Sequence, residues 1–376
     1  MQYINNLKVI VYFSGNIEEP KGTPIRVKNV LNELLKNGAD VHYCGPVCPK
    51  NFEEKKFLNM GSPYLRPIIL ARYARMHNID IIYIQTSAGL WLAPILQILT
   101  RAKVALDFHS LIVEEEKVYN NLGWLRYNFL KLIDYGETYF LDFATGVSYK
   151  LADYYKKVLT RYHVLPGGVD TQVFNAEVTP NAELLRWKGD STLIGYAGNT
   201  KWYQGLDTVL SALDLLEKKA PGKFKLFIVA SSLDASIEDF IRTHGLEASV
   251  KLLGKHDHKE MPSLLMSADV LTVVRPSDMV TEYAFPSKFP EYLALGKAVV
   301  FSRVGDIERY VQDHISAAIV NPSNPNELCD RLEELQDPIK RNILGKGALE
   351  VVRTKLDINV IGTDLYNFLK ETCKTK

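Results

Sequence analysis

The sequence predicts an α/β protein made of two Rossmann-like domains, each a doubly wound parallel sheet, that face a central cleft. Three observations predict this fold class. Short β-branched runs alternate with longer amphipathic stretches along the chain, which is the pattern of parallel strands covered on both faces by helices. Leu165-Pro166-Gly167-Gly168 interrupts the alternation. The 376 residues are enough for two domains of about 100–200 residues each.

The first half of the chain carries the elements expected of one such domain. Lys8–Phe13 is a buried strand pattern, and helical periodicity follows from Val27 to Asn37 and ends at Gly38. A long, aromatic-rich helix is expected at Trp124–Tyr139. Further strands are expected at Asp40–Cys44, Ile79–Gln85, Lys103–Phe108, Ala144–Val147 and Tyr162–Leu165. These elements predict a first domain at residues 1–166.

The second half repeats the alternation and predicts a second domain at residues 167–357. The last helical pattern, Val360–Thr372, has no strand after it. We therefore expect residues 358–376 to pack back on the first domain. The strands of the second half are expected at Leu193–Ala197, Lys225–Ala230, Val250–Leu253, Val270–Val274, Ala298–Ser302 and Ala317–Val320.

Composition excludes several classes of protein. Lys and Arg number 45 and Asp and Glu number 44, a net charge of +1. A nucleic-acid-binding chain usually has a basic excess, so no nucleic-acid partner is expected. The opening MQYINNLKVIVYF is typical of a first strand rather than a signal peptide. The apolar run Gly89–Leu99 is shorter than the roughly 20 residues of a spanning helix. We therefore expect a cytoplasmic protein.

Two segments mix basic and apolar side chains, and two interpretations of them stay open. Leu65–Arg75 and Trp124–Phe143 could rest on an anionic membrane surface, as basic amphipathic helices do. Alternatively, their aromatic residues face the core and their basic residues are solvated. The basic residues are Arg66, Arg72 and Arg75 in the first segment and Arg126 and Lys131 in the second.

The most informative segment runs from Arg275 to Lys297. It passes from a strand through a polar loop to a helix at Lys288–Leu295, with Ser287 as the expected N-cap and Gly296 at the end. Ligands of open α/β sheets bind beyond the carboxyl ends of the strands, and a helix N-terminus attracts a diphosphate.

Charged side chains of this segment suit such a ligand. Lys288 and Arg275 would add positive charge for the diphosphate, and Glu291 could accept hydrogen bonds from a ribose diol. The alternative interpretation is an ordinary βαβ crossover with capping residues.

The segment Glu291-Tyr292-Leu293-Ala294-Leu295-Gly296-Lys297 resembles the donor site of the family 4 glycosyltransferases. These are retaining enzymes of the GT-B fold, and the resemblance implies that Glu291 binds the ribose hydroxyls. In the family, seven residues separate an earlier glutamate from this one. Here eight residues separate Glu282 from Glu291, and Tyr283 stands in the expected place. Glu282, after a one-residue loop shift, and Asp278 are the two candidates for the contact with the transferred hexose.

Other parts of the chain extend the resemblance. His163–Asp170, followed by Phe174, is similar to the interdomain turn of the family, and Ile194–Gly198 with Gly205-Leu206-Asp207 is similar to the start of its donor domain. The family usually has an Arg and a Lys that clamp the diphosphate where this chain has Asn199 and Gln204. The candidate replacements are Lys201, Arg275 and Lys288, and Pro286-Ser287-Lys288 favours the last.

Four more residues belong to the expected site. Lys255 and His256 follow the strand at which the family holds the nucleobase. His109 follows a strand in the first half, where the family often has a histidine that faces the transferred sugar, although a lone histidine can equally be structural. Gly22 lies in the loop Ser14–Thr23, where a glycine would let backbone approach a phosphate or sugar.

The resemblance implies a hexosyltransferase of polysaccharide biosynthesis. It also implies that residues 1–166 form the acceptor-side domain and residues 167–357 the nucleotide-sugar-binding domain. The enzyme would move a hexosyl group from a UDP- or GDP-sugar to a hydroxyl of a glycan or lipid-linked acceptor, with retention. No cofactor or metal is expected, because the Asp-x-Asp motif of metal-dependent glycosyltransferases is missing. The alternatives are a nucleotide-sugar epimerase of GT-B shape and a non-catalytic partner subunit. A dinucleotide oxidoreductase is disfavoured, because no Gly-x-Gly-x-x-Gly is present.

Overall fold

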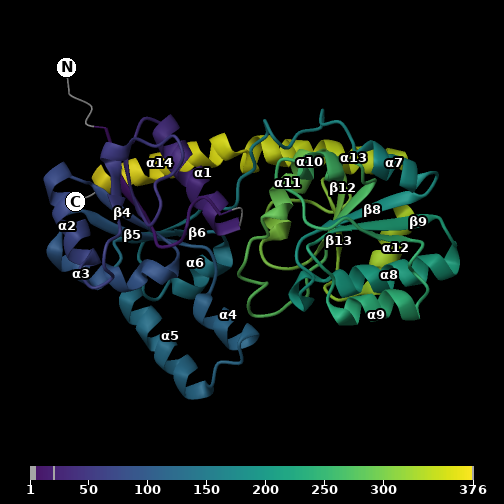
Figure 1. The fold of residues 1–376 in the computed structure, drawn as a ribbon, viewed down its shortest axis with the longest axis horizontal. Helices are drawn as coiled ribbons and strands as arrows, with labels where there is room; N and C mark the ends of the chain where they lie inside the picture. The colour runs from purple at the N-terminus through teal and green to yellow at the C-terminus, as the bar shows by residue number, and fades with distance from the viewer. Residues whose placement is uncertain (1–5, 20–21, 375–376) are drawn as a thin grey trace. The chain divides into compact units, whose positions relative to one another are not determined.

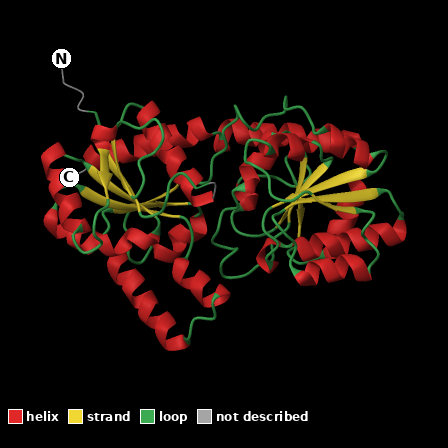
Figure 2. Cartoon of the chain, viewed as in Figure 1, coloured by secondary structure: helices red, strands yellow, loops and turns green. Residues whose placement is uncertain are grey.

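The computed structural model describes residues 6–19 and 22–374, which form two compact units. Unit 1 contains residues up to Gly167 together with the C-terminal segment from Ile358, and unit 2 is Gly168–Asp357. Each unit is a parallel sheet with helices on both faces (Figures 1 and 2). The two parallel sheets confirm the predicted α/β class.

Unit 1 is built on a seven-stranded sheet in the order β3-β2-β1-β4-β5-β6-β7. Its strands are β1 (Lys8–Phe13), β2 (Asp40–Gly45), β3 (Phe57–Asn59), β4 (Ile81–Gln85), β5 (Lys103–Phe108), β6 (Phe143–Gly146) and β7 (Tyr162–Val164). Its helices are α1 (Gly22–Lys36), α2 (Arg66–His77), α3 (Ala93–Leu99), α4 (Ile112–Tyr119), α5 (Trp124–Thr138), α6 (Tyr149–Tyr155) and α14 (Ile358–Lys374). The central strands are apolar on both faces, because helices bury both sides of the sheet.

Unit 2 is built on a six-stranded parallel sheet in the order β10-β9-β8-β11-β12-β13. Its strands are β8 (Thr192–Ala197), β9 (Phe224–Val229), β10 (Val250–Leu252), β11 (Val270–Val273), β12 (Ala298–Ser302) and β13 (Ala318–Val320). Its helices are α7 (Ala182–Lys188), α8 (Leu206–Lys219), α9 (Ala235–Thr243), α10 (Met261–Met266), α11 (Lys288–Ala294), α12 (Pro325–Glu334) and α13 (Pro338–Val351).

Successive residues of β12 show how the two cores of unit 2 arise. Val299 and Phe301 pack in one apolar cluster with residues of α11 and α13, whereas Val300 packs in a second cluster with residues of α8 and α12. Side chains alternate between the faces of a strand, so an unbroken apolar run supplies both layers. Polar loops follow the carboxyl ends of the strands.

The structure differs from the predicted elements in two places. β3 was not predicted, and it pairs with β2 at the edge of the sheet. Helix α1 begins at Gly22, five residues before the predicted Val27. No helix within the described residues is long and apolar enough to cross a bilayer.

Candidate functional site

The ammonium group of Lys288 is the centre of a polar cluster at the carboxyl end of β8. Lys288 is the first residue of α11, and its Nζ donates a hydrogen bond to Oε1 of Gln204 at 3.1 Å. The same Nζ lies 4.9 Å from the centre of the Tyr196 ring. A Cβ atom on Gly198 would come within 2.1 Å of it, so a side chain at that position would displace the lysine.

The surroundings of Lys288 disfavour its positive charge. Burial of the ammonium, together with repulsion from Arg275, lowers the pKa of Lys288 to about 7, although Glu291 acts in the opposite direction. Its hydrogen-bond partner Gln204 is neutral and does not balance the charge. An anion bound beside Lys288 would restore the charged form, because a nearby opposite charge raises the pKa of a lysine.

Arg275 brings a second cation to the end of β11. The residue is only 7% exposed, and its Nε donates to the backbone oxygen of Tyr203 at 3.3 Å. Ser302 donates a hydrogen bond to the backbone oxygen of Arg275 at 2.7 Å. At Gly205 the backbone has φ of +75°, and a Cβ there would lie 1.8 Å from the oxygen of Val274. Only glycine allows this close approach, which fixes Arg275 beside the turn after β8.

Two tyrosines lock the β8 turn to α11. The hydroxyl of Tyr292 accepts a hydrogen bond from the backbone N–H of Ala197 at 3.0 Å. The hydroxyl of Tyr196 donates to the backbone oxygen of Asn199 at 2.6 Å. The side chain of Asn199 accepts from the backbone N–H of Lys201 at 3.1 Å. The turn and the first residue of α11 therefore hold a fixed geometry.

Glu291 is paired with a histidine that sequence reasoning missed. Nε2 of His258 lies 3.2 Å from Oε1 of Glu291, and this hydrogen bond raises the pKa of His258. His258 stands two residues beyond His256 in the loop after β10, and that closeness was the available signal. His256 itself contacts the backbone oxygen of Leu253 and the side chain of Glu260, each at 3.2 Å.

The two acidic candidates for the hexose contact hold the polar loop in place. Oε2 of Glu282 accepts from the backbone N–H of Gly305 at 3.0 Å, and Oε1 accepts from the hydroxyl of Ser277. Oδ1 of Asp278 accepts from the backbone N–H groups of Val280 and Thr281 at 2.7 and 3.0 Å. Glu282 therefore ties the segment between β11 and α11 to the turn after β12, and Asp278 orients backbone within that segment.

Several predicted site residues lie outside the Lys288 cluster. Lys201 is 61% exposed on its side chain and lies 3.8 Å from Asp234, and Lys255 is also exposed. Ser287 occupies the N-cap position of α11, but its side chain makes no capping hydrogen bond. Helix α11 has seven residues and lacks this cap. For holding an anion, we therefore give the Lys288 side chain more weight than the end of the helix.

Gly22 belongs to a helix, contrary to its predicted place in a loop. It is the first residue of α1, and a Cβ there would meet no atom within 4 Å. The expected approach of backbone to a phosphate or sugar at Gly22 stays a prediction, and residues 20 and 21 lie outside the described residues.

In unit 1, His109 lies at the carboxyl end of β5 beside a buried carboxylate. Nε2 of His109 is 3.0 Å from Oδ2 of Asp107, which is fully buried. Arg26 donates two hydrogen bonds to Asp107, at 2.8 and 3.1 Å, and Thr145 donates a third at 2.6 Å. Burial would raise the pKa of Asp107, but Arg26 and His109 outweigh it and hold that pKa well below its ordinary value.

The ionised Asp107 orients the ring of His109. Burial lowers the pKa of His109, although Asp107 opposes this shift. A neutral ring that donates from Nε2 to Asp107 has Nδ1 as its remaining acceptor. Sequence reasoning did not assign Asp107 or Arg26, whose contact joins residues 81 positions apart.

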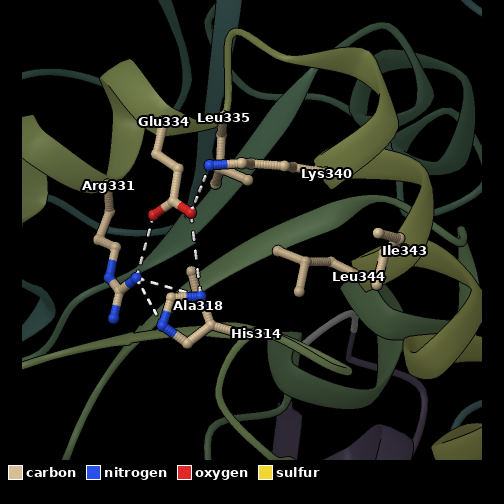
Figure 3. A pocket seen from close by; sticks show the side chains of 8 residues that line it. All are labelled: His314, Ala318, Arg331, Glu334, Leu335, Lys340, Ile343 and Leu344. Atoms are coloured by element: carbon tan, nitrogen blue, oxygen red, sulfur yellow. Dashed lines mark hydrogen bonds and ion pairs between the residues drawn. The ribbon is translucent and has the colours of Figure 1, made fainter.

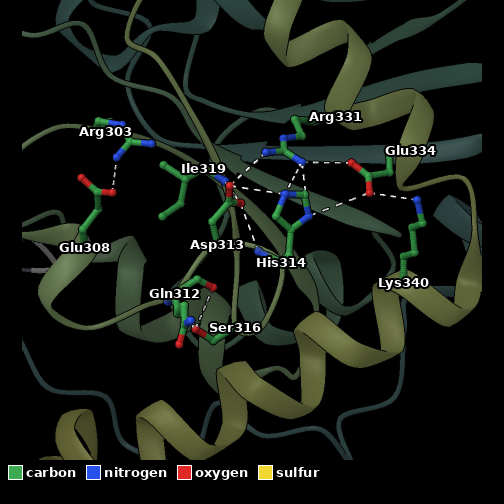
Figure 4. A network of polar contacts seen from close by, with 10 residues as sticks. All are labelled: Arg303, Glu308, Gln312, Asp313, His314, Ser316, Ile319, Arg331, Glu334 and Lys340. Atoms are coloured by element: carbon green, nitrogen blue, oxygen red, sulfur yellow. Dashed lines mark hydrogen bonds and ion pairs between the residues drawn. The ribbon is translucent and has the colours of Figure 1, made fainter.

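A pocket elsewhere in unit 2 is lined by charged side chains that pair with one another. His314, Arg331, Glu334 and Lys340 line a cavity of about 190 Å³ together with apolar residues of α13 (Figure 3). Arg331 bridges Asp313 and Glu334 at 2.9 and 3.0 Å, and Lys340 contacts Glu334 at 2.8 Å (Figure 4). The charges balance one another, so this network ties α12 to the segment before β13.

Two family models together match most of the chain. The model described as Glycosyltransferase Family 4 matches residues 20–173, and the model described as Glycosyl transferases group 1 matches residues 180–351. The chain belongs to the family 4 glycosyltransferases. The second match contains Lys288, Arg275 and Glu291, and the first contains His109 and Asp107.

Curated relatives of this family 4 chain are similar over part of their length. The D-inositol 3-phosphate glycosyltransferase of Paenarthrobacter aurescens is 30% identical over 51% of this chain and 47% of the relative. An uncharacterized glycosyltransferase of Methanocaldococcus jannaschii is 28% identical over 45% of this chain and 46% of the relative. The chain thus spans about half the length of the curated relatives it matches.

Solved structures share the GT-B fold with this family 4 chain. Sucrose-phosphate synthase from Thermosynechococcus elongatus superposes with a TM-score of 0.78 at 17% identity, over 99% of this chain and 100% of that one. Anabaena HepE in complex with UDP gives 0.76 at 16% identity, over 97% and 100%. At these identities the likeness concerns the fold.

Proposed function

We propose that this family 4 glycosyltransferase moves a hexosyl group from a nucleotide-diphosphate sugar to a hydroxyl of a glycan or lipid-linked acceptor, with retention. The observation that carries the proposal is the cation pair of Lys288 and Arg275 at the carboxyl ends of neighbouring strands. Burial and mutual repulsion disfavour the charge on Lys288 until an anion balances it. The diphosphate of the donor is an anion of the required charge.

A UDP-sugar is the first donor to test. Anabaena HepE has been solved in complex with UDP and with UDP-glucose, and that protein has the same fold. In the proposed arrangement Glu291 accepts hydrogen bonds from the ribose hydroxyls. Gly198 and Asn199 lie beside the diphosphate, and Lys255 and His256 lie near the base.

In the proposed reaction the bond from the anomeric carbon to the diphosphate breaks, and its electron pair leaves on the phosphate oxygen. Lys288 and Arg275 would stabilise that developing charge electrostatically. The acceptor oxygen forms a bond to the same face of the anomeric carbon, and its proton passes to a donor phosphate oxygen. His109, oriented by Asp107, would face the transferred sugar together with Glu282.

The test measures binding, hydrolysis and transfer with UDP-, GDP- and ADP-sugars. We expect one nucleotide series to bind and its sugar to be transferred. Lys288→Ala should lower turnover by more than about tenfold, because one charge stabiliser of the leaving group is lost. Lys218→Ala, at an exposed lysine paired with Asp214 on α8, is the matched control and should leave turnover unchanged.

Other outcomes distinguish the alternatives. Donor that binds but is never transferred, with any acceptor, would favour a non-catalytic partner subunit. A donor whose sugar is isomerised would favour an epimerase. Near-normal turnover of Lys288→Ala would remove this lysine from the diphosphate site.

We also propose a cytoplasmic location with a peripheral contact to the cytoplasmic face of the membrane.

A further inference from the structure

Helix α5 exposes large apolar side chains that a water-soluble surface would normally bury. Five of them are each between 62% and 76% exposed: Trp124, Leu125, Phe129, Leu132 and Tyr139. We call these five residues the α5 face. The spacing from Leu125 to Phe129 and Leu132 places them on one side of the helix. Contiguous apolar patches of this kind mark contact sites on otherwise soluble proteins.

The polar side of the same helix faces the protein. Glu114 of α4, which is almost fully buried, accepts hydrogen bonds from Tyr127 at 2.8 and 2.9 Å, from Lys131 at 2.9 Å and from Tyr154 at 2.9 Å. Asp134 accepts from the hydroxyl of Tyr155 at 2.8 Å. The orientation of α5, with polar groups inward and apolar groups outward, is therefore fixed by specific contacts.

The α5 face carries no negative charge. Every residue from 124 to 139 is described, and its two acidic residues, Asp134 and Glu137, are both partly buried. Burial raises the pKa of each of these carboxyls. Arg126, by contrast, is exposed beside Leu125. Among residues 124–139, the exposed charged side chain is therefore the positive Arg126.

Basic side chains continue beyond the end of α5. Helix α3 contacts both α5 and α2, and Gln97 of α3 donates to Asp142, just after α5, at 2.6 Å. Ile98 at the end of α3 is 80% exposed. Arg75, Arg101 and Lys103 line a cavity of about 790 Å³ beside it, together with Asp80, whose Oδ2 accepts from the backbone N–H of Lys8.

We propose that the α5 face docks this protein on an anionic lipid bilayer, with the basic residues around α3 against the headgroups. Apolar and aromatic side chains of an interfacial helix enter the acyl boundary, and arginines add attraction to anionic lipids. Trp124 and Tyr139 stand at the two ends of α5, the aromatic types enriched at membrane interfaces.

A second copy of the chain is the less favoured occupant. Helix α5 lies beside α4 at the edge of unit 1 (Figure 1). The positive charges around it would repel the same charges of a copy. This proposal deepens the membrane contact suggested above and rests on it. Its test needs no nucleotide sugar, so it can fail or succeed apart from the transfer reaction.

The experiment is co-sedimentation of the full chain with vesicles at low salt. One set is phosphatidylcholine alone, and in the other roughly a third of the lipid is phosphatidylglycerol. We expect binding to the anionic set at least about tenfold above the neutral set. The double variant Phe129→Ser/Leu132→Ser should lower that binding by more than about tenfold.

The control is Ile339→Ser/Ile343→Ser on α13, which also removes two exposed large apolar side chains, 70% and 52% exposed. It should bind vesicles like the wild type. Arg75→Gln/Arg101→Gln should weaken binding to the anionic set alone. Circular dichroism and thermal unfolding check that each variant is folded.

Three results would overturn the proposal. The wild type could fail to bind anionic vesicles at low salt. The α5 double variant could bind as well as the wild type. Light scattering could show dimers that the α5 double variant dissociates while vesicles are not bound, which would assign the face to a second copy.

Discussion

Lys288 brings an ammonium group next to the turn that follows β8. The family usually has an Arg and a Lys in that turn, whereas this chain has Asn199 and Gln204. In the structure Gln204 accepts the hydrogen bond of Lys288, and Gly198 leaves the space that the ammonium fills. The positive charge therefore comes from the first residue of α11 instead of the turn. A neutral amide at position 204 is compatible with the ammonium of Lys288 beside it, because a second cation at position 204 would repel the lysine.

The pKa of Lys288 leads to a prediction about pH. Near pH 8 the free protein carries Lys288 mostly uncharged, because its pKa is about 7. A bound diphosphate restores the charge, so UDP binding at pH 8 should take up about one proton, and close to none at pH 6. Titration calorimetry in buffers of different ionisation enthalpy measures this uptake.

The matched variant is Lys288→Met, which should bind UDP more weakly and take up no proton at either pH. Its free form should also unfold at a higher temperature. The lysine pKa falls on folding, so its contribution to stability improves as pH rises from about 7 towards 10.5 and is least favourable below pH 7. Unchanged proton uptake in Lys288→Met would assign the titration to another group.

At the scale of elements, Glu114 holds α4 and α5 together. Burial would raise the pKa of Glu114, but hydrogen bonds from Lys131 and the two tyrosines lower it. Glu114→Gln should reduce the free energy of unfolding by about 1–3 kcal/mol, because a hydrogen-bonded charge is lost and Lys131 is left without its partner. Urea denaturation at pH 7 measures this loss, and hydrogen exchange should rise in residues 112–138.

The control for Glu114→Gln is Glu116→Gln on the same helix. Glu116 is exposed and accepts a hydrogen bond from Asn120, so its replacement should change stability by less than about 0.5 kcal/mol. Because a depressed pKa stabilises the protein above the ordinary pKa of a glutamate, the difference between the two variants should shrink as pH falls through the acid range. A difference that stays constant below pH 4 would contradict the assigned charge.

The elements that could be predicted are those whose pattern is local. Central strands such as β1 and β4 are apolar runs between punctuating residues, and α11 follows a distinct loop. β3 has three residues at a sheet edge, too few for a period. The first turn of α1, Gly22-Thr23-Pro24, has no apolar period either, and Pro is common in a first turn.

The site was predictable where the chemistry lies in one segment. Lys288 and Glu291 stand one turn apart in one segment, so both could be proposed from the sequence, and their roles stay predictions. Arg26 meets Asp107 across 81 positions, and His258 meets Glu291 across 33. Such pairs depend on how strands are ordered in the sheet, so no local pattern in a single sequence reveals them.

At the scale of the whole molecule, the chain crosses between the units twice. After unit 2 it returns at Ile358 to unit 1, where Ile361, Leu365 and Leu369 of α14 join the apolar cluster of α1 and the sheet. Helices α1 and α14 meet at Gly362, where a Cβ would lie 2.5 Å from Cβ of Glu33. The stability of unit 1 therefore depends on its most distant segment in sequence.

Gly362→Val tests this dependence. The added side chain would separate α14 from α1 and should cost unit 1 about 1–3 kcal/mol, the usual penalty of overpacking. Because chains of two domains commonly unfold in more than one step, calorimetry should show one transition lowered and the other unchanged, and UDP should still raise the unchanged one. Gly136→Val on α5, where a Cβ meets nothing within 4 Å, is the control and should lower neither. If Gly362→Val lowered both transitions equally, the two units would unfold as one, and the stabilisation of unit 1 by α14 could not be separated from that of the rest of the chain.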